Sequence, residues 1–423
     1  MKKQFALVSL SALIPLALGG ACGEPDLEVK GTLQRVVGET VTLNLLEGDN
    51  GFSGTIELID ARAISFNTSA LEVNRTDARK LSFVIPTGIA LGQARARVER
   101  EDGERYVVPL EINRLALALD NKGVIETIPL QPATLSPGVV PAIDAVGGMI
   151  SLSPSGGELA VLAKDQLNML ALGAAPRAVG PGISQTGGRA ITAVPDGVLV
   201  CTDSALLLVR FKQGSTSQIS AAITGCKAIA ADSSGMYAVV LGTCDTDSDT
   251  QDEDCLTQFK IGSSITQMAQ ISLDTTPGAT HVAMRLDGKG AVVGDTDNIY
   301  GVWLDQVAPQ TPTAIAVSWG TSASVVGIDV TSSSLGDLFA VGDKTGKRIR
   351  FLGFDPKANN DLKTVFESTL PEEPVALSYG AGSLLYVSTG TRIYTLNAEQ
   401  PSRAAELITT ASANPTLFLA VQP

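Results

Sequence analysis

Histidine is nearly absent from this sequence: its 423 residues contain one, His281, and aromatic residues make up only 4%. General acid–base catalysis most often uses histidine, and zinc sites usually need two or more such ligands. A serine–histidine–aspartate triad would have to use His281, and no Gly-x-Ser-x-Gly segment precedes an expected helix. We therefore expect His281, in a strand at 280–284, to be a hydrogen-bonded structural residue.

Positive charge is also scarce, because 31 lysines and arginines stand against 44 aspartates and glutamates, for a formal net charge of −13. An acidic surface repels phosphate backbones and anionic lipid headgroups. The composition therefore predicts that nucleic acid is not a partner. The same charge also suits an exported protein that must stay in solution.

The apolar stretch near the N-terminus is too short to remain as a membrane span, because it covers only residues 5–18, after Lys2 and Lys3. A bilayer span needs about 20 apolar residues. A charged start, a short apolar stretch and small residues before a cleavage point are typical of a signal peptide. The pattern predicts a signal peptide over residues 1–21.

The small residues before Cys22 resemble the lipobox of bacterial lipoproteins. That resemblance implies cleavage before Cys22, a covalent diacylglycerol on its thiol and a short tether over residues 22–27. Gly23 stands where aspartate holds some lipoproteins at the inner membrane, so the resemblance implies an outer-membrane location. Leu18 lies four residues before Cys22 rather than three, so ordinary secretory cleavage near Ala21 is the alternative.

Cysteine use agrees with export, because an even number of cysteines follows Cys22 and disulfides suit an oxidising compartment. These four are Cys201, Cys226, Cys244 and Cys255. Three pairings are open, and we favour Cys201 with Cys226 and Cys244 with Cys255 because each closes a short loop. A four-cysteine metal site is the alternative, but the paired Cys-x-x-Cys spacing of such sites is missing.

Residues 28–114 contain short stretches of alternating apolar residues between turn residues. The stretches are 39–45, 54–59, 71–74, 81–85, 94–99 and 106–112. About seven short strands in so few residues predict a β-sandwich. Pro86, Gly88 and Gly92 follow one of these strands and resemble the corresponding positions in the IPT/TIG class of Ig-like domains. The resemblance implies an Ig-like sandwich and says little about function.

Residues 115–423 contain a recurring unit of short apolar strands separated by polar turns with glycine. Equivalent points in its middle strand are Leu159, Val198, Tyr237, Ala291, Phe339 and Leu385, which are 39, 39, 54, 48 and 46 residues apart. Four-stranded propeller blades typically repeat at about 40–50 residues. The spacing predicts a β-propeller over residues 115–423 and an all-β fold for the chain. A β-solenoid or a second sandwich is the structural alternative.

The two ends of this region supply a further unit. Residues 115–130 look like a hairpin without an inner strand, and residues 415–421 look like an inner strand without a hairpin. Joining them completes one blade and leaves no open edge in the ring, so the predicted number of blades is seven. Residues 385–390 resemble the YVTN class of propeller repeats, whereas the Trp-Asp dipeptide of WD40 blades is absent from the sequence.

The segment 244–255 places six carboxylates between two cysteines. Asp245, Asp247 and Asp249 alternate as oxygen ligands do at the start of calcium-binding loops. The EF-hand pattern then fails, because Leu256 takes the place of the closing glutamate. Two hypotheses stay open: a Ca²⁺ site on these three aspartates, and a solvated hairpin tip.

The leading hypothesis for function is a non-enzymatic lipoprotein of the cell envelope whose propeller binds a protein or glycan partner, because no catalytic constellation is recognised. One alternative is a structural or adhesive surface protein whose acidic loop is stiffened by Ca²⁺. A second alternative is a hydrolase or lyase that uses carboxylates in the central channel. Asp232 and Asp329, near inner-strand ends in different blades, are the best pair for that chemistry.

Overall fold

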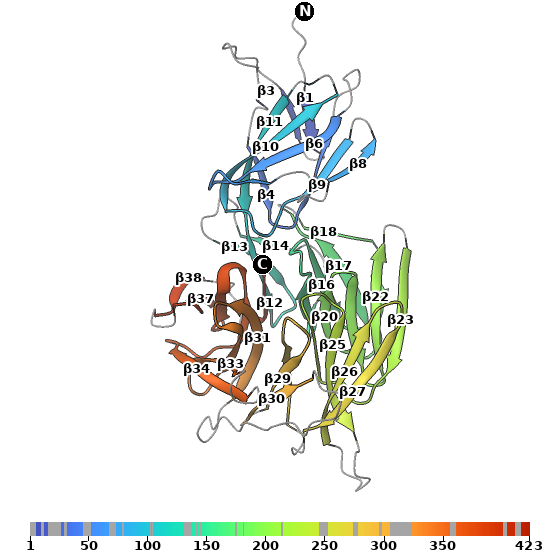
Figure 1. Ribbon diagram of the computed structural model, residues 1–423, viewed down its shortest axis with the longest axis vertical. Coiled ribbons are helices and arrows are strands. Elements are labelled where there is room, and N and C mark those ends of the chain that lie inside the picture. Colours follow the sequence, from blue (N-terminus) through green and yellow to red (C-terminus); the bar gives the residue numbers. More distant parts are fainter. Residues whose placement is uncertain are drawn as a thin grey trace, which may run out of the picture.

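The structure, a computed structural model, is built almost entirely of β-strands, as the sequence predicts. It describes residues 6–9, 12–15, 27–28, 32–44, 52–66, 73–77, 80–101, 103, 105–130, 137–140, 143, 145–173, 176–180, 182–212, 215–244, 253–273, 278–295, 298–304, 324–355, 361–400, 404–410 and 416–423. The N-terminal strands lie at one end of the long axis and a ring of small sheets lies at the other (Figure 1).

Two sheets form the N-terminal part. One has the strand order β2-β1-β5-β9-β8 and the other the order β3-β11-β10-β6-β7, with β4 beside β11. The strands are β1 (Ala6–Ser9), β2 (Ala12–Pro15), β3 (Leu27–Glu28), β4 (Leu33–Val36), β5 (Thr40–Asn44), β6 (Phe52–Ile59), β7 (Ser65–Phe66), β8 (Val73–Asp77), β9 (Lys80–Val84), β10 (Gly92–Arg100) and β11 (Arg105–Asn113). Because side chains alternate along a strand, one face of each sheet contributes to a single hydrophobic core.

The hairpin of β1 and β2 lies beside β5, where Val8 pairs with Asn44. It falls in the stretch for which the sequence predicts a signal peptide. Cleavage after residue 21 would remove the hairpin and leave β5 at the edge of its sheet. Among the described residues, no helix is long and apolar enough to cross a membrane.

Antiparallel sheets follow one another along residues 115–423, and the described residues form seven of them. Their first strands are β15 (Met149–Leu152), β20 (Gly188–Val194), β24 (Ala228–Ala231), β28 (His281–Met284), β31 (Val325–Ser333), β35 (Ala376–Tyr379) and β39 (Thr416–Val421). Each of these strands contacts the first strands of the two neighbouring sheets, and β39 contacts both β35 and β15. The first strands therefore form a closed innermost layer.

The second strands are β16 (Glu158–Ala163), β21 (Gly197–Thr202), β25 (Tyr237–Cys244), β29 (Gly290–Gly294), β32 (Gly336–Asp343), β36 (Leu384–Ser388) and β12 (Leu115–Asp120). All six equivalent points predicted from the sequence fall on these strands. A short 3-10 turn, η1 (Ala381–Ser383), connects β35 to β36. The last strand, β39, pairs with β12, so the two ends of the region share one sheet.

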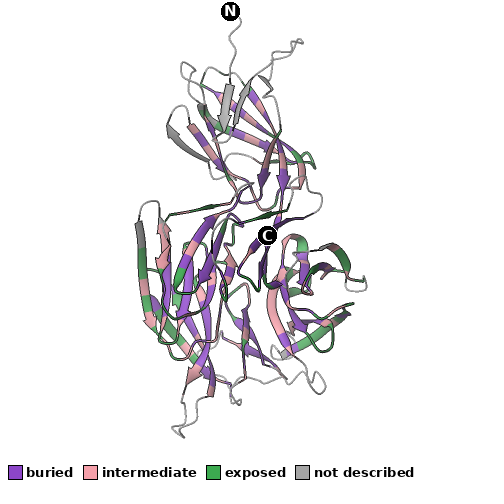
Figure 2. Cartoon of the chain, turned by 180° about the vertical axis from the view of Figure 1, so that it is seen from behind, coloured by how far each residue is buried: buried purple, intermediate pink, exposed green. Residues whose placement is uncertain are grey.

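The third strands are β13 (Ile125–Pro129), β17 (Gln166–Ala171), β22 (Ala205–Lys212), β26 (Glu253–Ile261), β30 (Ile299–Trp303), β33 (Arg348–Asp355) and β37 (Arg392–Asn397). The outer strands are β14 (Gly138–Val139), β18 (Arg177–Ala178), β19 (Ile183–Ser184), β23 (Ser215–Ala222), β27 (Ile265–Ser272), β34 (Asp361–Thr369) and β38 (Glu406–Thr410). Buried residues dominate the second strands, whereas outer strands such as β27 carry many exposed residues (Figure 2).

Apolar side chains fill each interface between consecutive sheets. One equivalent position on the innermost strands holds Ile150, Ile191, Ile229, Val282, Ile328, Leu377 and Leu419. Each of these packs in a hydrophobic cluster that includes residues of the preceding sheet. Every cluster contains residues of two sheets. Neighbouring sheets therefore bury their apolar faces against one another, and this burial stabilises the ring as a unit.

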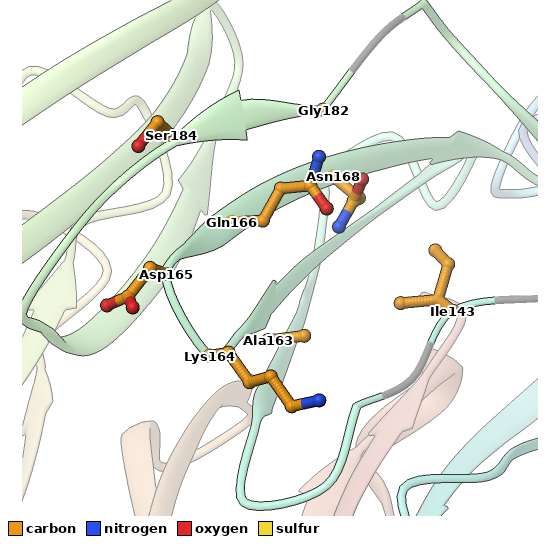
Figure 3. Close-up of a pocket in the computed structure, with 8 residues that line it drawn as sticks. All are labelled: Ile143, Ala163, Lys164, Asp165, Gln166, Asn168, Gly182 and Ser184. Carbon is orange, nitrogen blue, oxygen red and sulfur yellow. The ribbon is translucent and has the colours of Figure 1, made fainter.

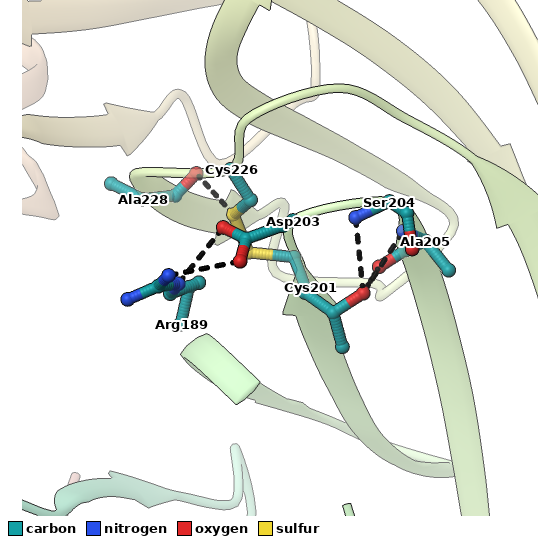
Figure 4. The surroundings of a disulfide bond; sticks show 8 residues. Arg189, Cys201, Asp203, Ser204, Ala205, Cys226 and Ala228 are labelled. Carbon is teal, nitrogen blue, oxygen red and sulfur yellow. Dashed lines mark hydrogen bonds and ion pairs between the residues drawn. A yellow bond between two sulfur atoms is a disulfide. The ribbon is translucent and has the colours of Figure 1, made fainter. Parts of the chain in front are cut away.

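Both favoured disulfides are present. Cys201 on β21 is bonded to Cys226, which lies just before β24, so this bridge links two consecutive sheets beside the Arg189–Asp203 ion pair (Figure 4). Cys244 is bonded to Cys255, and this bridge joins β25 to β26 across the base of the acidic segment. The sequence-local pairing is therefore confirmed.

The N-terminal sheets join the ring closely, because Arg114 is the single residue between β11 and β12. The carbonyl oxygen of Gly38 lies so near Gly157 that a Cβ built on Gly157 would be 2.2 Å from it. The two backbones are thus in direct contact, and the C-terminus lies at this junction (Figure 1).

Candidate functional site

The innermost strands carry small residues at the position that follows the apolar one. These residues are Ser151, Thr192, Ala230, Ala283, Asp329, Ser378 and Ala420. Six of the seven are neutral, and Asp329 is the ionisable member. Six of the seven equivalent sheets have an uncharged residue at this position. The fold therefore does not require a charge there, and the carboxyl group of Asp329 is a candidate functional group.

Asp329 bridges two innermost strands. Its Oδ2 accepts a hydrogen bond from the backbone N–H of Tyr379 on β35 at 2.7 Å, and its Oδ1 accepts one from the N–H of Val330 at 2.8 Å. The hydroxyl oxygen of Ser151, at the equivalent position, accepts from the N–H of Ala193 at 2.9 Å. Burial raises the pKa of Asp329 to about 6, although its hydrogen bonds oppose the rise. The carboxyl group therefore exchanges a proton close to neutral pH.

Tyr379 supplies a second polar group beside Asp329. Its side-chain hydroxyl is buried and has no hydrogen-bond partner among the described residues. Burial, followed by the nearby charge of Asp329, raises the pKa of Tyr379 well above its usual value, so the hydroxyl keeps its proton. The hydroxyl of Ser378 also interacts with Asp329 and lowers the pKa of that carboxyl. Asp329 on β31 thus interacts with both Ser378 and Tyr379 of β35.

His281 is the first residue of β28, and its Nδ1 lies 2.8 Å from the hydroxyl oxygen of Thr280. Burial lowers the pKa of His281, so the ring is neutral at pH 7. As the sequence predicts, this histidine is a hydrogen-bonded strand residue.

Asp232 and Asp329, the pair considered from the sequence, have separate hydrogen-bond partners. Asp232 lies in the turn between β24 and β25, where it accepts hydrogen bonds from the N–H of Tyr237 at 2.8 Å and from the hydroxyl of Ser234. It therefore caps its own turn. Within the described part of the chain, no hydrogen bond or ion pair joins the two carboxylates, so Asp329 stands without the second acid that the hypothesis required.

The other residues singled out in the sequence are outside the described residues. They are the lipidation candidate Cys22 and the calcium candidates Asp245, Asp247 and Asp249. Lipid attachment and Ca²⁺ binding at these positions stay predictions. In the ranges that the structure does describe, no group of three histidine, cysteine, aspartate or glutamate side chains is placed to hold a metal ion.

Asp254, at the end of the acidic segment, has a structural role. Its fully buried carboxylate pairs with Lys227 and accepts hydrogen bonds from the N–H groups of Gly278 and Ala279 at 2.9 and 2.7 Å. A buried carboxylate needs such partners to offset its lost hydration. Asp254 therefore anchors the base of the hairpin to the chain that follows β27.

Comparison with known proteins identifies the fold through structure alone. No protein-family model matches the sequence, and no curated protein sequence matches it. The periplasmic gluconolactonase PpgL of Pseudomonas aeruginosa superimposes with a TM-score of 0.55 at 11% identity, covering 73% of this chain and 99% of that chain. The chain has a β-propeller-like fold.

Two further propellers of this kind cover 73% of the chain. A putative 6-phosphogluconolactonase from Bacteroides uniformis has a TM-score of 0.53 at 13% identity, with 99% of that chain covered. A functionally unknown protein from Desulfotomaculum acetoxidans has a TM-score of 0.52 at 14% identity, with 98% of that chain covered. The sequence-based prediction of a propeller-like region is confirmed at this level.

The same comparison corrects the leading hypothesis for function. The sequence led us to expect a non-enzymatic binding protein because it contains no familiar catalytic motif. The similar propellers include a gluconolactonase and a putative 6-phosphogluconolactonase, so enzymes are found among proteins of similar fold. The expectation that the chain is not an enzyme fails for this reason, and the hydrolase alternative is the better supported one.

Sequence reasoning identified Asp329 but missed Tyr379 and Ser378. The recurring unit gave a signal that would have found them, because aligning the innermost strands places Ser378 at the position of Asp329 in the next sheet. The hydrogen bond from Tyr379 to Asp329 joins residues 50 positions apart and had no local signal.

Proposed function

We propose that this chain is a hydrolase that opens a lactone or a closely related ester at the innermost layer of its propeller, with Asp329 as the general base. The observation that carries the proposal is the position of Asp329, the ionisable residue among seven equivalent small ones. A carboxyl group with a pKa of about 6 is charged at neutral pH and is still basic enough to accept a proton.

The chemistry requires one water molecule and one proton transfer. The carboxylate of Asp329 takes a proton from water while the water oxygen attacks the carbonyl carbon of the lactone. The ring C–O bond then breaks, the proton passes to the departing ring oxygen, and the product is an open-chain hydroxy acid. The protonated hydroxyl of Tyr379 is a candidate donor to the carbonyl oxygen as negative charge develops there.

The substrate class is taken from the similar propellers. One is a gluconolactonase and another a putative 6-phosphogluconolactonase, so a sugar lactone is the first compound to test. The low identity of 11–13% leaves the choice of sugar to experiment.

We propose further that the fold is an Ig-like sandwich over residues 28–114 followed by a seven-bladed propeller over residues 115–423. The pairing of β39 with β12 and the contacts of β39 with β35 and β15 support a ring that is closed by both ends of the region. The two packed sheets of the N-terminal part support the sandwich.

We also propose that the protein works in the cell envelope, attached through Cys22 after removal of residues 1–21. The N-terminal sequence pattern and the two disulfides support this location, because disulfides persist in oxidising compartments. Mass spectrometry of the protein purified from its membranes tests it. A diacylglycerol-bearing Cys22 at the N-terminus is expected, and an unmodified N-terminus would contradict the proposal.

The decisive experiment measures acid release from glucono-1,5-lactone in a pH-stat, with the spontaneous rate subtracted at each pH. Asp329→Asn is expected to lower kcat by about 100-fold or more, because it removes the general base. Asp329→Ser is the sharper variant, since Ser151 shows that serine at this position still accepts the inter-strand hydrogen bond. It should fold normally and be equally inactive.

Asp203→Asn is the matched control, because Asp203 is an exposed carboxylate in the turn between β21 and β22, where it pairs with Arg189. It should retain full activity. The wild-type rate should rise with pH through about 6 as Asp329 ionises. If wild type does not exceed the spontaneous rate, or if Asp329→Ser is as active as wild type, Asp329 is not a catalytic base in this reaction.

A further inference from the structure

A cavity of about 550 Å³ lies on the sheet that contains β16 and β17 (Figure 3). Asp329 belongs to a different sheet, on β31. Its lining residues are Ile143, Ala163, Lys164, Asp165, Gln166, Asn168, Gly182 and Ser184. Most of these side chains are polar, and Ile143 is the one large apolar side chain among them. The volume is in the range that small-molecule sites occupy, about 300–1,000 Å³.

Two side-chain amides line the cavity. Gln166 and Asn168 are two residues apart on β17, so their side chains point to the same face of the sheet. Both reach the backbone of Gly182, because a Cβ built there would lie 2.2 Å from Gln166 Nε2 and 2.5 Å from Asn168 Oδ1. Only glycine at this position leaves room for the two amides as they stand.

The hairpin that joins β16 to β17 forms one wall. Its turn residues are Lys164 and Asp165, and Lys164 has a φ of +52°, a conformation that non-glycine residues seldom adopt. The carbonyl oxygen of Asp165 accepts from the N–H of Gln185 at 2.6 Å, and its carboxylate accepts from the N–H of Gly187 at 3.3 Å. The turn is therefore held against the chain that follows β19, and its two charged side chains stand at the rim of the cavity.

We propose that this cavity binds a polyhydroxylated molecule of monosaccharide size. The amides of Gln166 and Asn168 offer donors and acceptors to adjacent hydroxyl groups, and the hydroxyl of Ser184 adds another. Ile143, on the far side in Figure 3, provides an apolar surface for the C–H face of a sugar ring. The site uses none of the residues of the proposed hydrolase, so each proposal can be tested without the other.

The test uses the full-length protein with D-glucose, D-galactose and D-gluconate as probes, in saturation-transfer NMR followed by calorimetry. Gly182→Ala is the informative variant, because its methyl group would displace the far ends of two flexible side chains without blocking the backbone. Gln166→Ala removes one amide directly. Gln270→Ala, which removes an exposed amide from β27 in another sheet, is the matched control.

At least one probe is expected to bind, with a dissociation constant that Gly182→Ala and Gln166→Ala each raise at least about tenfold, or about 1.4 kcal/mol. Gln270→Ala should leave the constant unchanged. The proposal is overturned if none of the three probes binds at concentrations of about 50 mM, well above the range of specific sugar binding. Binding that is unaffected by both Gly182→Ala and Gln166→Ala would overturn it equally.

Discussion

The side-chain amide of Gln422 donates a hydrogen bond to the carbonyl oxygen of Val37 at 2.8 Å, although the two residues are 385 positions apart. The same amide nitrogen donates to the carbonyl oxygen of Gly156 at 2.7 Å, and the amide oxygen accepts from the N–H of Leu115 at 2.8 Å. Gln422 thus connects the N-terminal part of the chain with two sheets of the ring at a fully buried point.

Replacing Gln422 with alanine should therefore destabilise the protein strongly. The change leaves two carbonyl oxygens and one N–H group without partners in a buried place, and we expect a loss of about 3 kcal/mol in the free energy of unfolding. Urea denaturation followed by circular dichroism measures it. Gln270→Ala, at an exposed amide on β27, is the control and should change the free energy by less than about 0.5 kcal/mol. Equal effects of the two variants would show that Gln422 does not secure the junction.

The Cys201–Cys226 disulfide should stabilise the ring because it ties two consecutive sheets together. It closes a loop of 25 residues, and the chain-entropy estimate for such a loop is about 3.5 kcal/mol. The double variant Cys201→Ser/Cys226→Ser should lose that amount in urea denaturation. The Cys244–Cys255 bridge spans 11 residues of one hairpin, so its removal should cost less. If removal of the Cys244–Cys255 bridge lowered the free energy of unfolding more than removal of the Cys201–Cys226 bridge, the entropic explanation would be wrong.

The raised pKa of Asp329 makes a specific contribution to the pH dependence of stability. Between the ordinary value of 3.8 and about 6, the folded protein holds this proton more tightly than the unfolded chain. The stabilisation from Asp329 is therefore present below pH 4 and is lost as the pH rises through 6. Relative to wild type, Asp329→Asn should gain up to about 3 kcal/mol in the free energy of unfolding between pH 4 and pH 7.

Urea denaturation of wild type and Asp329→Asn at pH 4, 5, 6 and 7 checks this expectation. Asp203→Asn serves as the control, because the Arg189 ion pair lowers the pKa of Asp203 instead. Free energies of unfolding for wild type and Asp329→Asn that run parallel across the whole range would mean that the pKa of Asp329 is ordinary.

The acidic segment gives the last prediction. If Asp245, Asp247 and Asp249 bind Ca²⁺, millimolar Ca²⁺ should raise the melting temperature, because a ligand that binds only the folded state stabilises it. Asp247→Asn should reduce that rise, and Mg²⁺ at the same concentration should produce less of it, because it demands a stricter octahedral geometry. No rise with Ca²⁺ would favour the solvated hairpin tip.

The sequence by itself predicted the class of fold and the positions of the second strands, and it favoured, among three open pairings, the disulfide pairing that the structure has. Each rests on short-range patterns: alternation with a period of two, a recurring unit at about 40–50 residues, and cysteines that close short loops. Tyr237 and Phe339 could be placed on equivalent strands because the apolar alternation around them is local.

The sequence could not distinguish Asp232 from Asp329, since both are aspartates close to the end of an expected inner strand. Tertiary structure separates them: Asp232 caps its own turn, whereas the half-buried Asp329 bridges to Tyr379 on the innermost strand of the next sheet, and its pKa is raised there. The roles of Gln422 and Gly182 were likewise hidden in the sequence. Burial, pKa and close approach depend on residues that are distant along the chain, and only the folded ring brings those residues together.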